Sequence, residues 1–288
     1  MAIANKTKLS LRRQVTDWAA TLAAGTAAFL VLAPLVAVFG YLIYRGIGAL
    51  DLAFLTNTPK PVGEVGGGMA NAIVGSGLIL AIGSVIGVPL GIATGVYLSE
   101  YGKHRFGDVV RFTSDLLNGV PSIVIGIVVY SLIVLQQKHF SAFSGGVALG
   151  IMMIPTIARS TEEMLLMVPQ NVREAALGLG VPQWRTTLSI TLRTATSGII
   201  TGVMLAFARV AGETAPLLFT AFGNQFWNLK PNQPTAALPL QIFAYANSPY
   251  DEWHRQAWAG ALVLIILIVG TVSVVRLIAR RGVLQGAN

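Results

Sequence analysis

The sequence predicts an all-α polytopic membrane protein, and its composition and the lengths of its apolar stretches support this prediction. Of its 288 residues, 54% are hydrophobic and only 11% are charged, whereas soluble domains carry about a quarter charged residues. Stretches long enough to cross a bilayer follow one another along nearly the whole chain. Because a spanning segment must satisfy its own backbone hydrogen bonds in lipid, we expect these stretches to be helices. The chain has no cysteine, which excludes disulfides and cysteine-ligated metal centres.

Six candidate spans are separated by polar segments rich in glycine and proline. They lie at residues 19–44, 71–98, 112–135, 145–166, 196–222 and 257–279. The first span is longer than the apolar core of a signal peptide, which has about 7–15 residues, so we expect it to be retained. The chain outside the first span and the region of residues 71–279 consists of three segments. They are an N-terminal tail at 1–18, a loop at 45–70 and a C-terminal tail at 280–288.

The distribution of lysine and arginine orients the spans. If the N-terminus is cytoplasmic, fourteen of the 20 basic residues fall in inner segments, five fall in outer segments, and Arg209 lies inside a span. Basic residues are enriched on the cytoplasmic side, so we expect both termini to be inside. The same placement explains the net charge of +8 without a nucleic-acid partner.

Glycines recur every four residues in the second span. Gly83, Gly87, Gly91 and Gly95 therefore share one face of the predicted helix. Small residues let another backbone approach closely, which is how membrane helices associate. The pattern predicts packing within the chain, and a subunit contact or a pore wall are the alternatives.

The longest inner segment, residues 167–193, is expected to contain a short helix. Asn171 followed by Glu174 is a helix-start pattern, and Gly178, Gly180 and then Pro182 are stop signals. A helix of about two turns is marginal alone in water, so we expect a partner to stabilise it.

This segment resembles the EAA loop of type I ABC-importer permeases, which have a MetI-like core. The matching stretch reads "EAALGLGVPQWRTTLSITL", and Arg193 stands where that family has a closing proline. The resemblance implies that the loop docks on a separate ATPase, with coupling residues Glu174, Ala175, Ala176 and Gly180. An ordinary amphipathic interfacial helix is the alternative. The permease domain implied by the resemblance covers residues 71–279.

A wider resemblance covers residues 45–279 and concerns the permeases of ABC-type phosphate importers. It is carried by "GGGMANAIVGSG", "SEYG", "PSIVIGIVVY" and above all "ARVAGETAPLLFTAFGNQFW". It implies half of a translocation path for inorganic phosphate in a bacterial inner membrane. The implied partners are a second permease (PstC-like), an ATPase dimer (PstB-like) and a periplasmic phosphate-binding protein (PstS-like). Other oxyanions such as sulfate or molybdate, an ion-coupled secondary transporter and a membrane scaffold remain as alternatives.

We expect no catalytic chemistry and no cofactor in this chain. It lacks the G-x-x-x-x-G-K-[ST] loop that cradles nucleotide phosphates, so ATP would be used by a partner. The three histidines, His104, His139 and His254, are isolated and show no metal-ligand spacing.

Two opposite charges stand within the fifth predicted span. If residues 196–222 form one helix, Arg209 lies near the bilayer midplane, where a charge costs about 2.5–3.5 kcal/mol on insertion scales. A guanidinium matches two phosphate oxygens, and a carboxylate can accept the O–H of hydrogen phosphate, which sulfate lacks. We therefore expect a substrate-binding site at Arg209, Glu213 and Thr214. An ion pair between Arg209 and Glu213, four residues apart, is the structural alternative.

Overall fold

A computed structural model describes residues 11–64 and 66–285, and these residues are helical apart from turns, loops and one isolated bridge between Phe222 and Thr235. The helices are α1 (Leu11–Ile47), α2 (Leu52–Thr56), α3 (Ala70–Glu100), α4 (Arg105–Gly119), α5 (Ser122–Val129), α6 (Leu135–Gln137), α7 (Ala142–Leu166), α8 (Gln170–Gly178), α9 (Gln183–Thr186), α10 (Leu192–Ala211), α11 (Ala215–Thr220), α12 (Leu238–Ala246) and α13 (Asp251–Gln285). Two π-helical turns, η1 (Tyr130–Val134) and η2 (Thr187–Thr191), join α5 to α6 and α9 to α10.

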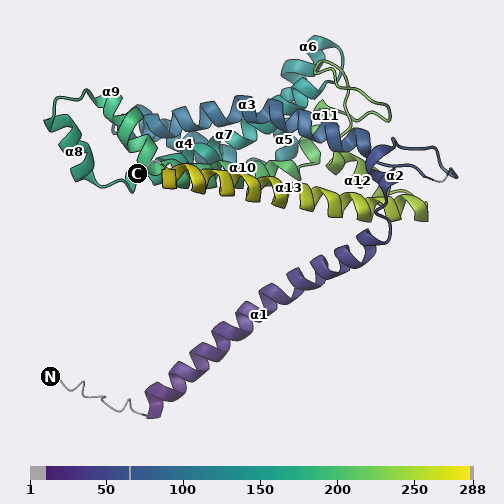
Figure 1. The fold of residues 1–288 in the computed structure, drawn as a ribbon, viewed down its shortest axis with the longest axis horizontal. Coiled ribbons are helices and arrows are strands. Elements are labelled where there is room, and N and C mark those ends of the chain that lie inside the picture. Colours follow the sequence, from purple (N-terminus) through teal and green to yellow (C-terminus); the bar gives the residue numbers. More distant parts are fainter. Residues whose placement is uncertain (1–10, 65, 286–288) are drawn as a thin grey trace.

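Five segments of the described chain are long and apolar enough to span a membrane, which confirms the predicted class. They are Arg12–Ile47, Ala70–Glu100, Ala142–Leu166, Gln183–Ala211 and Asp251–Ala279. A sixth span is possible only as a broken pair, α4 with α5–α6, which bends by 104°. The bundle is therefore that of a multi-pass membrane protein (Figure 1).

The prediction of a continuous third span at residues 112–135 is wrong. Its first half lies in α4, and the chain turns at Val120 and Pro121 before α5 begins. Val120 is extended, with φ −69° and ψ 131°. A residue that precedes proline is disfavoured in the α region, so Pro121 stops α4 there.

The prediction of a continuous fifth span at residues 196–222 is also wrong. The helix begins earlier, through α9 and η2, and ends at Ala211; a second helix, α11, starts at Ala215. Gly212 is the C-cap residue of α10, and Pro216 lies in the first turn of α11. Proline cannot donate to the carbonyl four residues back and clashes with it, so one helix cannot run through Gly212 to Pro216.

Helix α1 is longer than the predicted span at 19–44 and diverges from the other helices (Figure 1). None of its most apolar window is buried. Its last turns pack on α13, where Tyr41 meets Trp258 edge to face with ring centroids 5.2 Å apart. Helix α13 continues to Gln285, so most of the predicted tail at 280–288 is helical.

The core is built on the pairing of α3 with α7. The glycine ladder of α3 faces α7: a Cβ on Gly87 would lie 2.8 Å from the carbonyl oxygen of Gly150, and one on Gly95 would lie 2.6 Å from that of Ala158. Packing within the chain is therefore confirmed as the role of the ladder. A second cluster at the opposite end of the bundle from α8 joins α2, α12 and α13 around Phe54, Met69 and Leu238.

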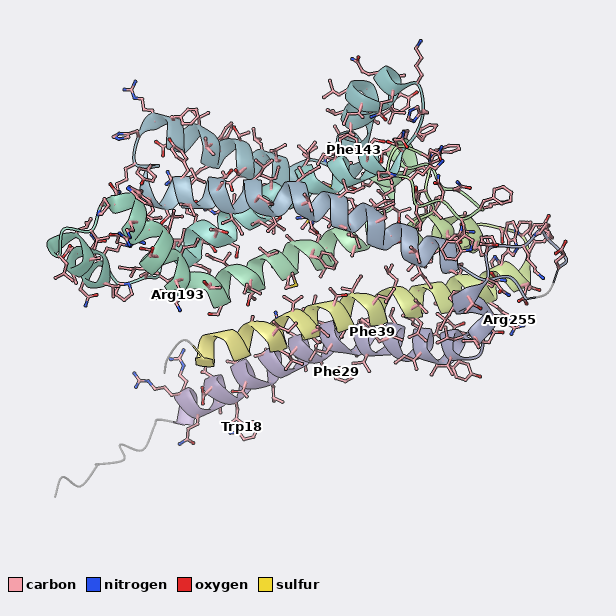
Figure 2. All side chains as sticks on the ribbon, turned by 45° about the horizontal axis from the view of Figure 1, so that its top comes forward. Trp18, Phe29, Phe39, Phe143, Arg193 and Arg255 are labelled. Carbon is pink, nitrogen blue, oxygen red and sulfur yellow. The ribbon has the colours of Figure 1, made fainter. Side chains whose placement is uncertain are left out.

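The loop helices lie at opposite ends of the bundle. In Figures 1 and 2, α8 and α9 lie near the end where α13 finishes, and the start of α1 points toward that side. Helices α2 and α12 lie at the other end, as does Arg255 (Figure 2). The inner loop predicted from the sequence and the two described chain ends therefore share one side.

Candidate functional site

The break between α10 and α11 places three predicted site residues beside one another. Arg209 lies in the last turn of α10, Glu213 lies in the break, and Thr214 is the N-cap residue of α11. The amide of Glu213 donates to the carbonyl of Val210, at 3.1 Å, which closes the end of α10. Pro216 is buried, and a Cβ on Gly126 of α5 would lie 2.7 Å from its Cα, so α11 is fixed against the core.

Contacts with α7 place Arg209 near the middle of the bundle. On α10, Gly198 lies against Met164 and Gly202 lies against Ser160, so the two helices run antiparallel. Continuing this register by about two turns brings Arg209 roughly level with Met153, which is near the middle of Ala142–Leu166. Met153 in turn faces Gly87, near the middle of α3. Arg209 thus lies about level with the middle of α7 and α3, although the span from which the sequence predicted a midplane position is broken.

The side chain of Arg209 is exposed, and Glu213 and Thr214 are half-buried. Across residues 11–64 and 66–285, Arg209 has no ion pair and no side-chain hydrogen bond. The alternative of an Arg209–Glu213 ion pair is therefore not realised. Thr214 makes no side-chain cap bond, so its hydroxyl is also uncommitted.

This arrangement is incompatible with a lipid-facing surface. Irregular backbone at membrane depth is tolerated only where it is buried in protein or lines a water-filled cavity. Gly212 in the break is exposed, and so is the guanidinium beside it. The surface that carries Arg209 and Gly212 must therefore face a water-filled route or another protein.

A stripe of exposed side chains, polar except for Leu205, extends from Arg209 along α10. Arg193, Ser197, Thr201 and Leu205 precede Arg209 at four-residue intervals, and all five are exposed. The opposite face, with Ile199, Gly202 and Ala206, is buried. The sequence interpretation missed Ser197 and Thr201, although their spacing from Arg209 is a signal that a helical projection reveals.

The inner loop forms the short helix α8, which ends at Gly178 as predicted, with Gly180 at φ +79°. The predicted start is wrong: α8 begins at Gln170 after Pro169, and no side chain caps it, so Asn171 lies inside the helix. Proline suits the position before a first turn because its missing N–H would have no partner there. Glu174, Ala175 and Gly180 are exposed, whereas Ala176 is buried.

Arg173 anchors α8 to the spanning helices. Its Nη1 lies 3.2 Å from Oε1 of Glu100, the last residue of α3, and its Nη2 donates to the carbonyl of Leu165 in α7, at 2.6 Å. Both charged side chains are nearly buried, with exposed fractions of 14% and 7%.

The described residues contain no cluster of three or more histidine or acidic side chains that could hold a metal ion.

Comparisons with known proteins agree with this architecture. Residues 87–282 match the family described as binding-protein-dependent transport system inner membrane component. The fold is similar to that of a chain in the inward-facing MetNI methionine ABC transporter, with a TM-score of 0.55, 18% identity and coverage of 75% of this chain and 96% of that one.

Curated relatives are similar over most of their length. The phosphate transport system permease protein PstA of Yersinia pestis is 47% identical over 228 residues, 79% of this chain and 77% of that protein. PstA of Haemophilus influenzae is 48% identical over 79% of this chain and 81% of its own length. PstA 1 of Mycobacterium tuberculosis (strain ATCC 25618 / H37Rv) is 38% identical over 95% and 91%, respectively. The chain therefore belongs to the binding-protein-dependent transport system inner membrane components, among the PstA-type permeases of phosphate transport systems.

Proposed function

We propose that this chain forms half of the translocation path of an ATP-driven importer of inorganic phosphate. A second, PstC-like permease completes the path, a PstB-like ATPase dimer drives it, and a PstS-like binding protein delivers phosphate. Three observations support the proposal: the similarity to PstA proteins, the membrane-spanning bundle, and the exposed inner loop whose sequence resembles the EAA loop. The chain itself acts without catalysis and without a cofactor.

The unpaired guanidinium of Arg209 is the observation that carries the proposal. It lies about midway along the bundle, beside a helix break, on a face that lipid cannot cover. An arginine presents paired donors that fit two oxygens of a phosphate. Glu213 accepts a hydrogen bond from the O–H of hydrogen phosphate, and Thr214 contributes a hydroxyl donor. A comparable set on the second permease completes the site.

The polar stripe provides a route from this site toward the end that carries α8. Ser197 offers a hydroxyl donor and Arg193 attracts the anion at the end of the stripe, whereas the hydroxyl of Thr201 donates to the carbonyl of Ser197, at 3.0 Å, and would have to turn away from it to contact the anion. Conduction requires sites that bind strongly enough for entry and weakly enough for release. A hydroxyl group binds an anion more weakly than an arginine does, so hydroxyl groups between Arg209 and the end of the stripe meet this requirement.

Helix α8 couples the path to the ATPase. Glu174, Ala175 and Gly180 present a small, partly acidic surface, and the neighbouring Leu177 and Leu179 are 47% and 85% exposed. Large exposed apolar side chains beside small residues suit a protein contact. In this orientation α8 and both chain ends face the cytoplasm of a bacterium, as the distribution of lysine and arginine predicts.

Reconstitution tests the proposal directly. The chain is co-expressed with the other three components, purified as a complex and placed in proteoliposomes. We expect uptake of labelled phosphate that depends on ATP and on the binding protein, and that excess sulfate does not inhibit. Uptake driven by an ion gradient without the ATPase, or equal inhibition by sulfate, contradicts the proposal.

A further inference from the structure

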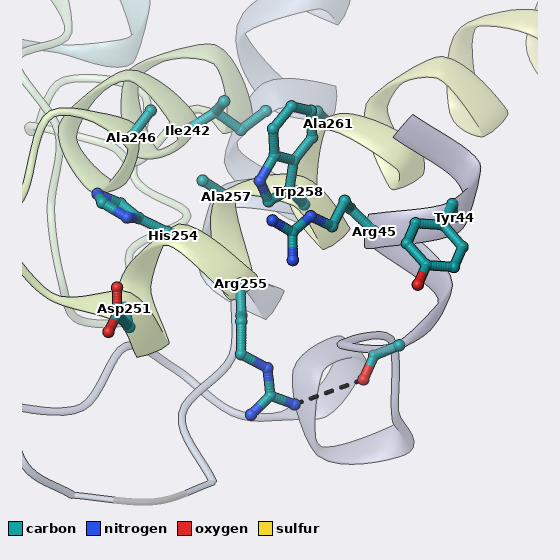
Figure 3. A pocket seen from close by; sticks show the side chains of 11 residues that line it. Tyr44, Arg45, Ile242, Ala246, Asp251, His254, Arg255, Ala257, Trp258 and Ala261 are labelled. Carbon is teal, nitrogen blue, oxygen red and sulfur yellow. Dashed lines mark hydrogen bonds between the residues drawn. The ribbon is translucent and has the colours of Figure 1, made fainter. Parts of the chain in front are cut away.

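A cavity of about 790 Å³ lies at the junction of α1, α12 and α13, at the end of the bundle opposite α8 (Figure 3). This volume is in the range of small-molecule sites, about 300–1,000 Å³. The space exists because small residues line it, among them Gly48, Ala246 and Ala257. No residue of this cavity belongs to the α10–α11 site or to the inner loop.

Arg45 offers unused donors in this cavity. Its Nε donates to the hydroxyl of Tyr41, at 3.0 Å, and the guanidinium lies over the Tyr41 ring at 5.5 Å from the centroid. Within the described part of the chain, neither terminal nitrogen of Arg45 has a partner. The ring holds the side chain in place while two N–H edges stay free for an oxyanion.

Charges of both signs line the cavity. Arg255 reaches in from α13; its Nη1 lies 3.2 Å from Glu252, and its Nη2 donates to the carbonyl of Gly48, at 3.4 Å (Figure 3). Asp251 lies on the wall away from Arg45 and has no ion pair among the described residues (Figure 3). Within the described residues, the terminal nitrogens of Arg45 and the carboxylate of Asp251 thus lie unpaired on separate walls of the cavity. This arrangement fits a zwitterionic ligand better than a simple anion.

The cavity lies at the ends of two candidate spanning helices, which is the level at which we expect lipid head groups to meet acyl chains. Arg45 lies in the last turn of α1 and Asp251 is the first residue of α13, so both lie at the ends of membrane-spanning helices. Trp258 and Ala261 line the cavity about two and three turns further into α13, and Ile242 lines it from α12. Tyrosine and tryptophan at this level are typical of the membrane interface.

We propose that this cavity binds a phospholipid with a phosphoethanolamine head group. The phosphodiester contacts Arg45, with Arg255 nearby, the ammonium contacts Asp251, and one acyl chain lies along Trp258 and Ala261. The inference needs only that the chain spans a bilayer, so it succeeds or fails independently of phosphate transport.

Lipid retention by the purified complex tests the site. The complex is depleted of lipid, incubated in mixed micelles with phosphatidylethanolamine or phosphatidylglycerol, and analysed by native mass spectrometry. We expect saturable retention of phosphatidylethanolamine and a roughly tenfold weaker affinity in Arg45→Gln, the loss of a charge-assisted bond. Asp251→Asn should remove the preference for ethanolamine over glycerol head groups. Lys230→Ala, which removes an exposed cation outside the cavity, is the matched control.

Three results overturn the proposal. Equal lipid retention by Arg45→Gln and the unmodified complex excludes the arginine as the head-group ligand. Displacement of the lipid by millimolar inorganic phosphate assigns the cavity to free phosphate instead. A photo-crosslinking residue at Ala246 that captures the second permease rather than lipid assigns it to a subunit contact.

Discussion

Arg173 of α8 and Glu100 of α3 form a nearly buried ion pair, with 3.2 Å between Nη1 and Oε1, although 73 residues separate them in the sequence. The same guanidinium donates to the carbonyl of Leu165 at the end of α7. One side chain therefore joins α8 to both central helices of the core. If α8 docks on the ATPase as proposed, this contact is the direct link through which a displacement of α8 would reach α3 and α7.

Removing Arg173 should loosen α8 without unfolding the bundle. Breaking a buried ion pair from one side costs about 3–5 kcal/mol, because it leaves the other charge unpaired. We expect Arg173→Ala to accelerate tryptic cleavage after Arg185 and to reduce the ATPase stimulation produced by phosphate-loaded binding protein. The charge exchange Arg173→Glu with Glu100→Arg should restore part of both. Unchanged cleavage in Arg173→Ala contradicts an anchoring role.

Reversing the charge of Glu174 should weaken attachment of the ATPase. The side chain is exposed on α8 and makes no described contact that stabilises the fold, so the change acts at the docking surface. We expect Glu174→Lys to lower the amount of ATPase that co-purifies with the permeases. Glu252→Lys, an exposed glutamate at the opposite end of the bundle, is the control and should leave the yield unchanged. Equal ATPase recovery from both variants argues against docking through α8.

Neutralising Glu213 should reduce selectivity more than transport rate. Hydrogen phosphate donates an O–H to a carboxylate, whereas fully ionised sulfate is repelled by it; a glutamine can donate to either anion. We expect Glu213→Gln to make phosphate uptake sensitive to excess sulfate. Sulfate inhibition that remains as weak as in the unmodified complex rules out contact between Glu213 and the transported anion.

The glycine ladder should tolerate no side chain. A Cβ on Gly95 would lie 2.5 Å from Cβ of Thr161 and 2.6 Å from the carbonyl of Ala158, so α3 and α7 would have to separate. We expect Gly95→Ala to lower the free energy of unfolding by about 1–3 kcal/mol or more, as overpacking does. Gly77→Ala on the same helix is the control, because its Cβ meets nothing within 4 Å. Thermal unfolding in detergent measures both, and equal midpoints contradict the packing role.

The fold class was predictable from the sequence because apolar length alone specifies spans. The helix breaks before α5 and before α11 were not predictable in this way, because a hydropathy value is averaged over a window of residues that includes the break. Pro121 and Pro216 carried the local signal, but both lie within apolar stretches that read as continuous. The π-helical turn η2, which joins α9 to α10, left no signal that we recognised.

The sequence named the residues of the proposed transport site but did not predict their arrangement. A pair four residues apart meets only on a continuous helix, and the break at Gly212 moves Glu213 off the helix that carries Arg209. The sequence therefore suggested an ion pair that the structure does not form. Contacts between distant segments, such as Arg173 with Glu100 or the cavity between Arg45 and Asp251, depend on packing that no local pattern encodes.

Uptake by Arg209 variants is the most direct test of the proposed transport site. The complex carrying Arg209→Ala is compared in proteoliposomes with Arg209→Lys and with Arg105→Ala, an exposed arginine at the start of α4. We predict intact assembly in all three, uptake of labelled phosphate lowered at least roughly tenfold in Arg209→Ala, partial uptake in Arg209→Lys, and normal uptake in Arg105→Ala. Phosphate uptake by assembled Arg209→Ala complexes at the rate of the unmodified importer would contradict the proposed site.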